Sequence, residues 1–167
     1  MAGQFLLLVF AFLMVLAAAK DGMSFTIPNW LSGGLAVVFP LAAAMLGLGW
    51  TEFGLHMLTG LGALLIGMAL FAPGWIGGGD AKLFAAAALW FGWPDAAMFL
   101  AKAALMGGVL AVTLLMIRRA APASGLPRQW LEGKLLMQGG PAPYGIALAA
   151  GALWALPDSR IFALAAL

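Results

Sequence analysis

Few side chains in this sequence could carry out catalysis, and their types exclude several catalytic classes. The chain has one histidine, His56, and no cysteine. A zinc site needs several His, Cys or carboxylate ligands, and His56 has no second His or Cys to complete one. None of the serines lies in the glycine-flanked turn that presents a nucleophilic serine, so a pairing with His56 is not expected. We therefore expect no metal and no cofactor, and carboxylate chemistry remains.

Asp21 and Asp80 are the carboxylates that could act together. Two carboxyl groups at hydrogen-bonding distance cannot both ionise readily, so they share one proton. The ionised partner can then take a proton from a bound water, while the protonated partner polarises a peptide carbonyl and a carboxyl group protonates the leaving amine. Such a pair would hydrolyse a peptide bond. It titrates as a unit, so its acid and base roles stay open.

A run of three glycines, Gly77, Gly78 and Gly79, comes directly before Asp80. These glycines lack the side chains that would keep an extended peptide away from the aspartate, and they permit backbone angles closed to other residues. A flexible turn between helices is the alternative interpretation. Lys82 either favours the ionised form of Asp80 or is a positive charge at a membrane interface.

The elements that must hold these residues are apolar helices. Hydrophobic residues make up 65% of the 167 residues and charged residues 8%, and the mean hydropathy is +1.06. A soluble domain has about a quarter charged residues, so soluble classes are excluded. The net charge of +2 is too small to indicate nucleic-acid binding.

The apolar segments approach the ~20 residues that a membrane-crossing helix needs. We therefore predict an all-α, polytopic membrane protein in which residues 1–167 form a single membrane-embedded unit. No charged side chain precedes the first segment, whereas a signal peptide has a basic stretch there, so we expect a retained helix. About six transmembrane helices are predicted, over residues 4–19, 30–48, 55–72, 83–93, 95–117 and 142–156. The fourth is expected to begin with part of the glycine-rich loop.

The charges of the predicted loops are distributed unequally. The first, third and fifth loops carry the bases Lys20, Lys82, Arg118, Arg119, Arg128 and Lys134. The other loops and the C-terminal tail carry Glu52, Asp95, Asp158 and Arg160. The positive-inside rule then predicts cytoplasmic odd-numbered loops and both termini outside, with Asp21 and Asp80 on the cytoplasmic face. Lys102 lies inside the fifth helix and is expected to extend toward its nearer end. His56 is interpreted as an interfacial or helix-start histidine.

Three segments resemble one known family. The segment from Gly77 to Leu83 is similar to the Gly-x-Gly-Asp-x-Lys signature of the prepilin peptidases, which are bacterial membrane aspartic proteases. Asp21, with Ile27-Pro28-Asn29 six residues later, resembles their first catalytic motif. The segment Pro143-Tyr144-Gly145-Ile146-Ala147, followed by Gly151, resembles the last helix of the small members that serve tight-adherence (Flp-type) pili.

The resemblance implies that Asp21 and Asp80 are the catalytic pair and that Gly77 and Gly79 shape the loop carrying Asp80. It implies a prepilin substrate, cleaved in the bacterial inner membrane after a glycine that precedes its apolar helix, with the short basic leader on the cytoplasmic side. Larger members have a cytosolic insertion with paired cysteines and methylate the new terminus. This sequence has no cysteine and lacks that insertion, so no methyltransferase activity is expected. The oligomeric state stays open.

Several residues have two interpretations. Pro28 and Asn29 start the second helix, since proline is tolerated there, and Asn29 could also contact substrate. Tyr144 either anchors the chain at the interface or reaches the active-site loops. The segment 118–140 is expected to lie on an anionic membrane surface, with Glu132 paired to neighbouring bases. The alternative function is a non-catalytic membrane protein, such as a transporter or a pilus-assembly scaffold.

Overall fold

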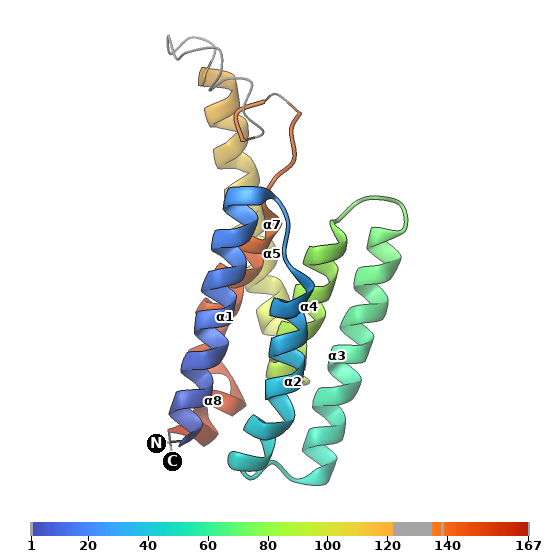
Figure 1. The fold of residues 1–167 in the computed structure, drawn as a ribbon, viewed down its shortest axis with the longest axis vertical. Helices are drawn as coiled ribbons and strands as arrows, with labels where there is room; N and C mark the ends of the chain where they lie inside the picture. Colours follow the sequence, from blue (N-terminus) through green and yellow to red (C-terminus); the bar gives the residue numbers. More distant parts are fainter. Residues whose placement is uncertain (1, 122–134, 138, 167) are drawn as a thin grey trace.

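Helices form all the regular structure in the computed structural model, which describes residues 2–121, 135–137 and 139–166 (Figure 1). The elements are α1 (Ala2–Ser24), α2 (Asn29–Met45), α3 (Trp50–Phe71), α4 (Gly78–Phe91), α5 (Asp95–Ala120), α7 (Tyr144–Ala155), η2 (Leu156–Asp158) and α8 (Arg160–Ala165). The predicted all-α class is confirmed. Among the described residues, α1, α3 and α5 are long and apolar enough to cross a membrane, and α2 is a shorter apolar helix.

Each of the six predicted segments contains a helix, but several bounds differ. The expected end of the first helix before Asp21 is wrong, because α1 continues to Ser24 and ends only where Phe25 adopts a left-handed φ of 54°. α3 begins at Trp50, about a turn earlier than expected, with Glu52 in its first turn, where an acid is favourable. α4 begins inside the glycine run, at Gly78. α8 was not predicted.

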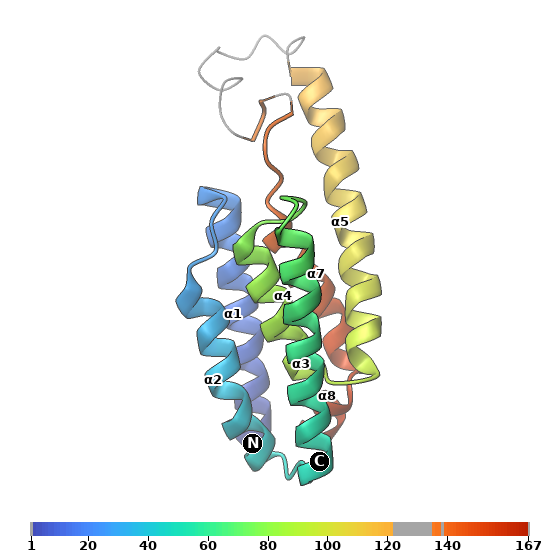
Figure 2. The ribbon, with the colours of Figure 1, turned by 90° about the vertical axis from the view of Figure 1, so that its right-hand side faces the viewer.

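The two ends of the bundle differ in what they carry. Figures 1 and 2 show that the last turn of α1 and the first turns of α4 and α7 lie at one end, and that both chain termini lie at the other. The end away from the termini carries the bases Lys20 of α1, Lys82 of α4, and Arg118 and Arg119 in the last turn of α5. The acids Glu52 and Asp95 begin α3 and α5 at the opposite end. The bases and the aspartates Asp21 and Asp80 therefore share one end, as the loop charges predicted. That this end faces the cytoplasm stays a prediction.

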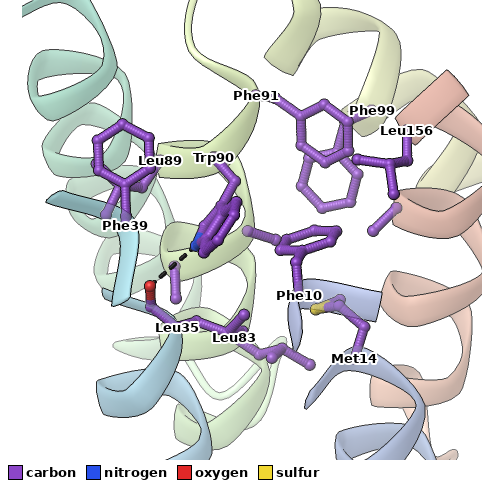
Figure 3. Packing of buried hydrophobic residues seen from close by; sticks show 14 of the residues in the cluster. Phe10, Met14, Leu35, Phe39, Leu83, Leu89, Trp90, Phe91, Phe99 and Leu156 are labelled. Atoms are coloured by element: carbon purple, nitrogen blue, oxygen red, sulfur yellow. Dashed lines mark hydrogen bonds between the residues drawn. The ribbon is translucent and has the colours of Figure 1, made fainter. Parts of the chain in front are cut away.

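The centre of the bundle is α4, which packs against α2, α3, α5 and α7. Its Trp90 is fully buried between Phe10 and Phe39, and the indole N–H donates to the carbonyl of Leu35 at 2.9 Å (Figure 3). The indole therefore buries a large apolar surface without leaving its polar group unpaired.

His56 belongs to this core, so its interpretation as an interfacial histidine is wrong. The side chain is 7% exposed and stacks on Phe39, with ring centroids 5.1 Å apart. Its Nδ1 lies 2.8 Å from the carbonyl oxygen of Leu89. The ring therefore joins α2, α3 and α4.

Charged groups join the helices at the end that holds the termini. Lys102 extends to this end, where its Nζ bonds Asp158 and the carbonyl oxygen of Trp154. The backbone N–H of Arg160 donates to Asp95 at 2.6 Å, and its guanidinium pairs with Glu52. Because Glu52 is on α3 and Asp95 on α5, Arg160 bridges the starts of these two helices.

Candidate active site

Asp21 lies in the last turn of α1 and is 5% exposed. The backbone N–H of Gly145 donates to its Oδ2 at 2.7 Å. Gly145 is in the first turn of α7, so the carboxylate satisfies one of the free N–H groups at that helix start. The aspartate therefore connects the end of α1 to the start of α7.

The contact requires glycine at position 145. A Cβ there would lie 2.9 Å from Asp21 Oδ2 and 2.8 Å from the Cδ1 atom of Ile27. Both distances are shorter than real Cβ contacts, so any side chain would displace its neighbours. The sequence identified this segment by resemblance but did not predict that Gly145 contacts Asp21.

Asp80 lies in the first turn of α4, whose N-cap is Gly77. Its carboxylate accepts a hydrogen bond from the backbone N–H of Gly77, as an acid at the third helical position does in a capping box. The other oxygen, Oδ1, is buried, and no partner for it occurs in the described part of the chain. Asp80 thus presents one uncommitted oxygen.

Ile27 connects the surroundings of the two aspartates. A Cβ at Gly79, next to Asp80, would lie 3.1 Å from Ile27 Cβ, and the side chain of Ile27 also reaches Gly145 beside Asp21. Burial, and to a lesser degree the negative charge of Asp21, raise the pKa of Asp80 to about 6, although the Gly77 hydrogen bond opposes the rise. The carboxyl group of Asp80 therefore holds its proton to a higher pH than an ordinary aspartate does.

The other predicted residues of this region lie around the pair. Gly78 and Gly79 form the first two positions of α4, so they belong to a helix start rather than to a free loop. Pro28 is the N-cap of α2 and Asn29 its first residue. The ammonium of Lys82 donates to Asn29 Oδ1 at 2.9 Å, which ties α4 to α2.

Tyr144 begins α7, is 40% exposed and lines the same cavity as Asp80. Tyr144 and Asp80 therefore border one cavity. Arg118 was predicted only as an orienting charge, yet its guanidinium donates to the carbonyls of Leu135, Gly140 and Pro141 at 2.7–2.9 Å. It holds the chain that leads into α7. The rest of segment 118–140, with Arg128, Glu132 and Lys134, lies largely outside the described residues.

Within the described ranges, no group of three or more His, Cys, Asp or Glu side chains could hold a metal ion. Residues 8–112 match the family model described as the type IV leader peptidase family. The matched range covers more than half of the chain and contains both aspartates. Neither the curated proteins nor the solved structures gave a match.

Proposed function

Because the chain belongs to the type IV leader peptidase family, we propose that it is an aspartic endopeptidase that uses Asp21 and Asp80. Its substrate is a Flp-type prepilin, whose short basic leader it removes after a glycine at the cytoplasmic face of the bacterial inner membrane. The observation that carries the proposal is that Ile27 lies close both to Gly79, next to Asp80, and to Gly145, which bonds Asp21, while one buried oxygen of Asp80 has no partner among the described residues.

In the proposed reaction the two carboxyl groups hold one proton between them. The ionised carboxylate takes a proton from water, and the water oxygen forms a bond to the scissile carbonyl carbon. The other carboxyl group gives its proton to the carbonyl oxygen, which yields a tetrahedral diol. As the C–N bond breaks, one carboxyl group protonates the leaving amine and the other carboxylate takes a proton from a diol hydroxyl, so a carboxylic acid forms and the pair again holds one proton.

The raised pKa of Asp80 supports this chemistry, because a carboxyl group with a pKa of about 6 can both donate and accept a proton near neutral pH. The absence of cysteine from the sequence supports a peptidase that does not methylate its product. Gly77, Gly78, Gly79 and Lys82 support the pair through the start of α4 rather than through direct chemistry.

The test uses the purified protein in detergent with a Flp-type prepilin, alongside Asp21→Asn and Asp80→Asn. Asp95→Asn is the matched control, since Asp95 lies at the opposite end and its amide oxygen can still accept from the Arg160 N–H. Mass spectrometry identifies the new N-terminus and any added methyl group. We expect cleavage after a leader glycine by wild type and by Asp95→Asn, and none by the other two variants.

Two results would contradict the proposal. Cleavage that survives either substitution at Asp21 or Asp80 means that the pair is wrong. A folded wild-type protein that cleaves no prepilin favours the alternative of a non-catalytic membrane scaffold.

A further inference from the structure

A cavity of about 540 Å³ opens beside Asp80, between α3 and α5. Its walls are Ile66 and Leu70 of α3 and the face of α5 that contains Gly108. α4 and α7 form the floor, with Tyr144 near Asp80. In Figure 2, α3 and α5 stand beside each other with α7 visible between them. α3 packs chiefly on α4, and α5 chiefly on α7, so the two walls are not packed together.

The cavity continues toward the opposite end of the bundle. A second cavity of about 390 Å³ shares Ile66, Phe84 and Leu100 with the first. Together their linings extend along α3 from residue 55 to residue 70. At a rise of 1.5 Å per residue this is about 22 Å. The two cavities therefore form one groove, which we name the α3/α5 groove.

One face of α4 forms the floor of the groove. Asp80, Phe84 and Ala88 all line it, and residues four apart lie on the same side of a helix. Asp80 is the one charged side chain in the described lining. The groove is thus an apolar channel with the candidate catalytic carboxylate at one end.

The lining suits a helix as the occupant. An extended chain inside an apolar groove would leave its backbone N–H and C=O groups unpaired, whereas a helix satisfies them internally. The α5 wall is made of small residues near the aspartate, which let another helix approach closely. These residues are Ala104, Gly107, Gly108 and Ala111. Ile66 and Leu100 are 57% and 50% exposed, so apolar surface is left for a partner to cover.

We infer that the α3/α5 groove binds the apolar helix of the substrate and so presents the peptide bond just before that helix to Asp80. The inference rests on the proposed function, which supplies a substrate with an apolar helix beside its cleavage site. Continuity with the candidate active site fixes the occupant: a helix lying in this groove ends beside the carboxylate. The groove thereby selects substrates by the size of the side chains on that helix.

A second groove provides the alternative location. It lies between α2 and α3, has a volume of about 480 Å³ and contains Gly33, Ala36 and Lys82. Its polar end holds the Lys82 ammonium bonded to Asn29, and neither aspartate lines it. A helix in this second groove would end beside an ammonium group, which cannot activate water as a base.

The test fills each groove separately. An added Cβ at Gly108 or at Gly33 meets no atom within 4 Å, so a leucine fits at either position without a clash at the backbone. Both glycines are in helices, where leucine is the better helix former. We expect Gly108→Leu to lower kcat/KM for prepilin cleavage about tenfold or more, as overfilling a packed site does, and Gly33→Leu to leave it within about twofold.

A direct measurement of contact complements the kinetics and does not depend on turnover. The sequence has no cysteine, so two variants of the Asp80→Asn protein can each carry one cysteine, in one groove or in the other. The prepilin carries a cysteine in its apolar helix. Ala104→Cys and Ala36→Cys are the matched positions, one in each groove. We expect disulfide formation with Ala104→Cys and little with Ala36→Cys.

The outcomes separate this inference from the proposed function. If wild type cleaves no prepilin, the proposed function fails. If wild type cleaves but Gly33→Leu is the impaired variant, or Ala36→Cys is the one that crosslinks, the groove assignment alone is wrong. If Gly108→Leu does not fold, the crosslinking result decides.

Discussion

Replacing Gly145 with alanine should disable Asp21 without altering any ionisable group. The new Cβ would lie 2.9 Å from Asp21 Oδ2, 3.0 Å from Asp21 Cβ and 2.8 Å from Ile27 Cδ1. Cβ atoms in real structures essentially never come this close, so α7 and the aspartate must separate. The 2.7 Å hydrogen bond from the Gly145 N–H to the carboxylate is then lost or lengthened.

The expected loss follows from that one bond. A hydrogen bond to a charged group contributes about 1.5–3 kcal/mol. If Asp21 must keep this orientation during the reaction, the barrier rises by the same amount, and about 1.4 kcal/mol corresponds to a factor of ten in rate. We therefore expect kcat/KM of Gly145→Ala to fall by about 10- to 150-fold.

The assay is prepilin cleavage in detergent, with initial rates measured at several substrate concentrations. Gly22→Ala is the matched control, because it adds a methyl group to the same α1–α7 contact, one residue from Asp21. There the nearest atom is the end of the Ile146 side chain at 3.3 Å, which can move aside. A Gly145→Ala enzyme with wild-type kcat/KM would refute the idea that the start of α7 orients Asp21.

Three further outcomes concern stability, measured by thermal unfolding in detergent. The pKa of Asp80 is about 6 in the folded protein, against an ordinary value of 3.8, so the wild type loses stability as the pH rises through this interval. Asp80→Asn should therefore be the more stable protein above pH 6 and lose this advantage below about pH 4. Parallel pH profiles of the two proteins would contradict the raised pKa of Asp80. Asp158→Ala should lower the midpoint more than Lys102→Met, because it leaves a buried ammonium without its carboxylate; the reverse order would show that the ion pair is not what holds Lys102. Gly67→Val should lower the midpoint, because its Cβ would meet Ala81 Cβ at 3.0 Å, whereas a Cβ at Gly62 meets nothing within 4 Å; equal effects of Gly67→Val and Gly62→Val would exclude close packing as the cause.

The arrangement of the helices could be predicted from the sequence because apolar runs and charges mark it directly. The runs are interrupted at Lys20-Asp21, at Pro73 and at Arg118, and the helices end within a few residues of these points. Alternation of loops between the two ends then places Asp21 and Asp80 at the same end of the bundle. This inference needs no long-range contact, so composition and order along the chain suffice.

The contacts that shape the site could not be predicted, because they join residues far apart in the chain. The Gly145 N–H meets a carboxylate 124 residues earlier, and Arg118 bonds carbonyls about twenty residues later. The extent of α1 was missed for a different reason: charged residues in the last turn of a helix look the same in sequence as charged residues in a loop. The buried position of His56 could not be predicted either, because the Leu89 carbonyl beside its ring lies 33 residues later in the chain.

The bridge formed by Arg160 joins the two walls of the α3/α5 groove at one end. Since Arg160 joins Glu52 and Asp95, the two walls are held together at the end away from Asp80. While the bridge holds, a widening of the groove would be greatest at the other end, beside the aspartate. The ion pair of Arg160 with Glu52 is exposed enough to be screened by salt. Raising the ionic strength should therefore loosen this hold at the terminal end and change the width of the groove beside the aspartate, where Leu70 lies 18 residues after Glu52 on α3.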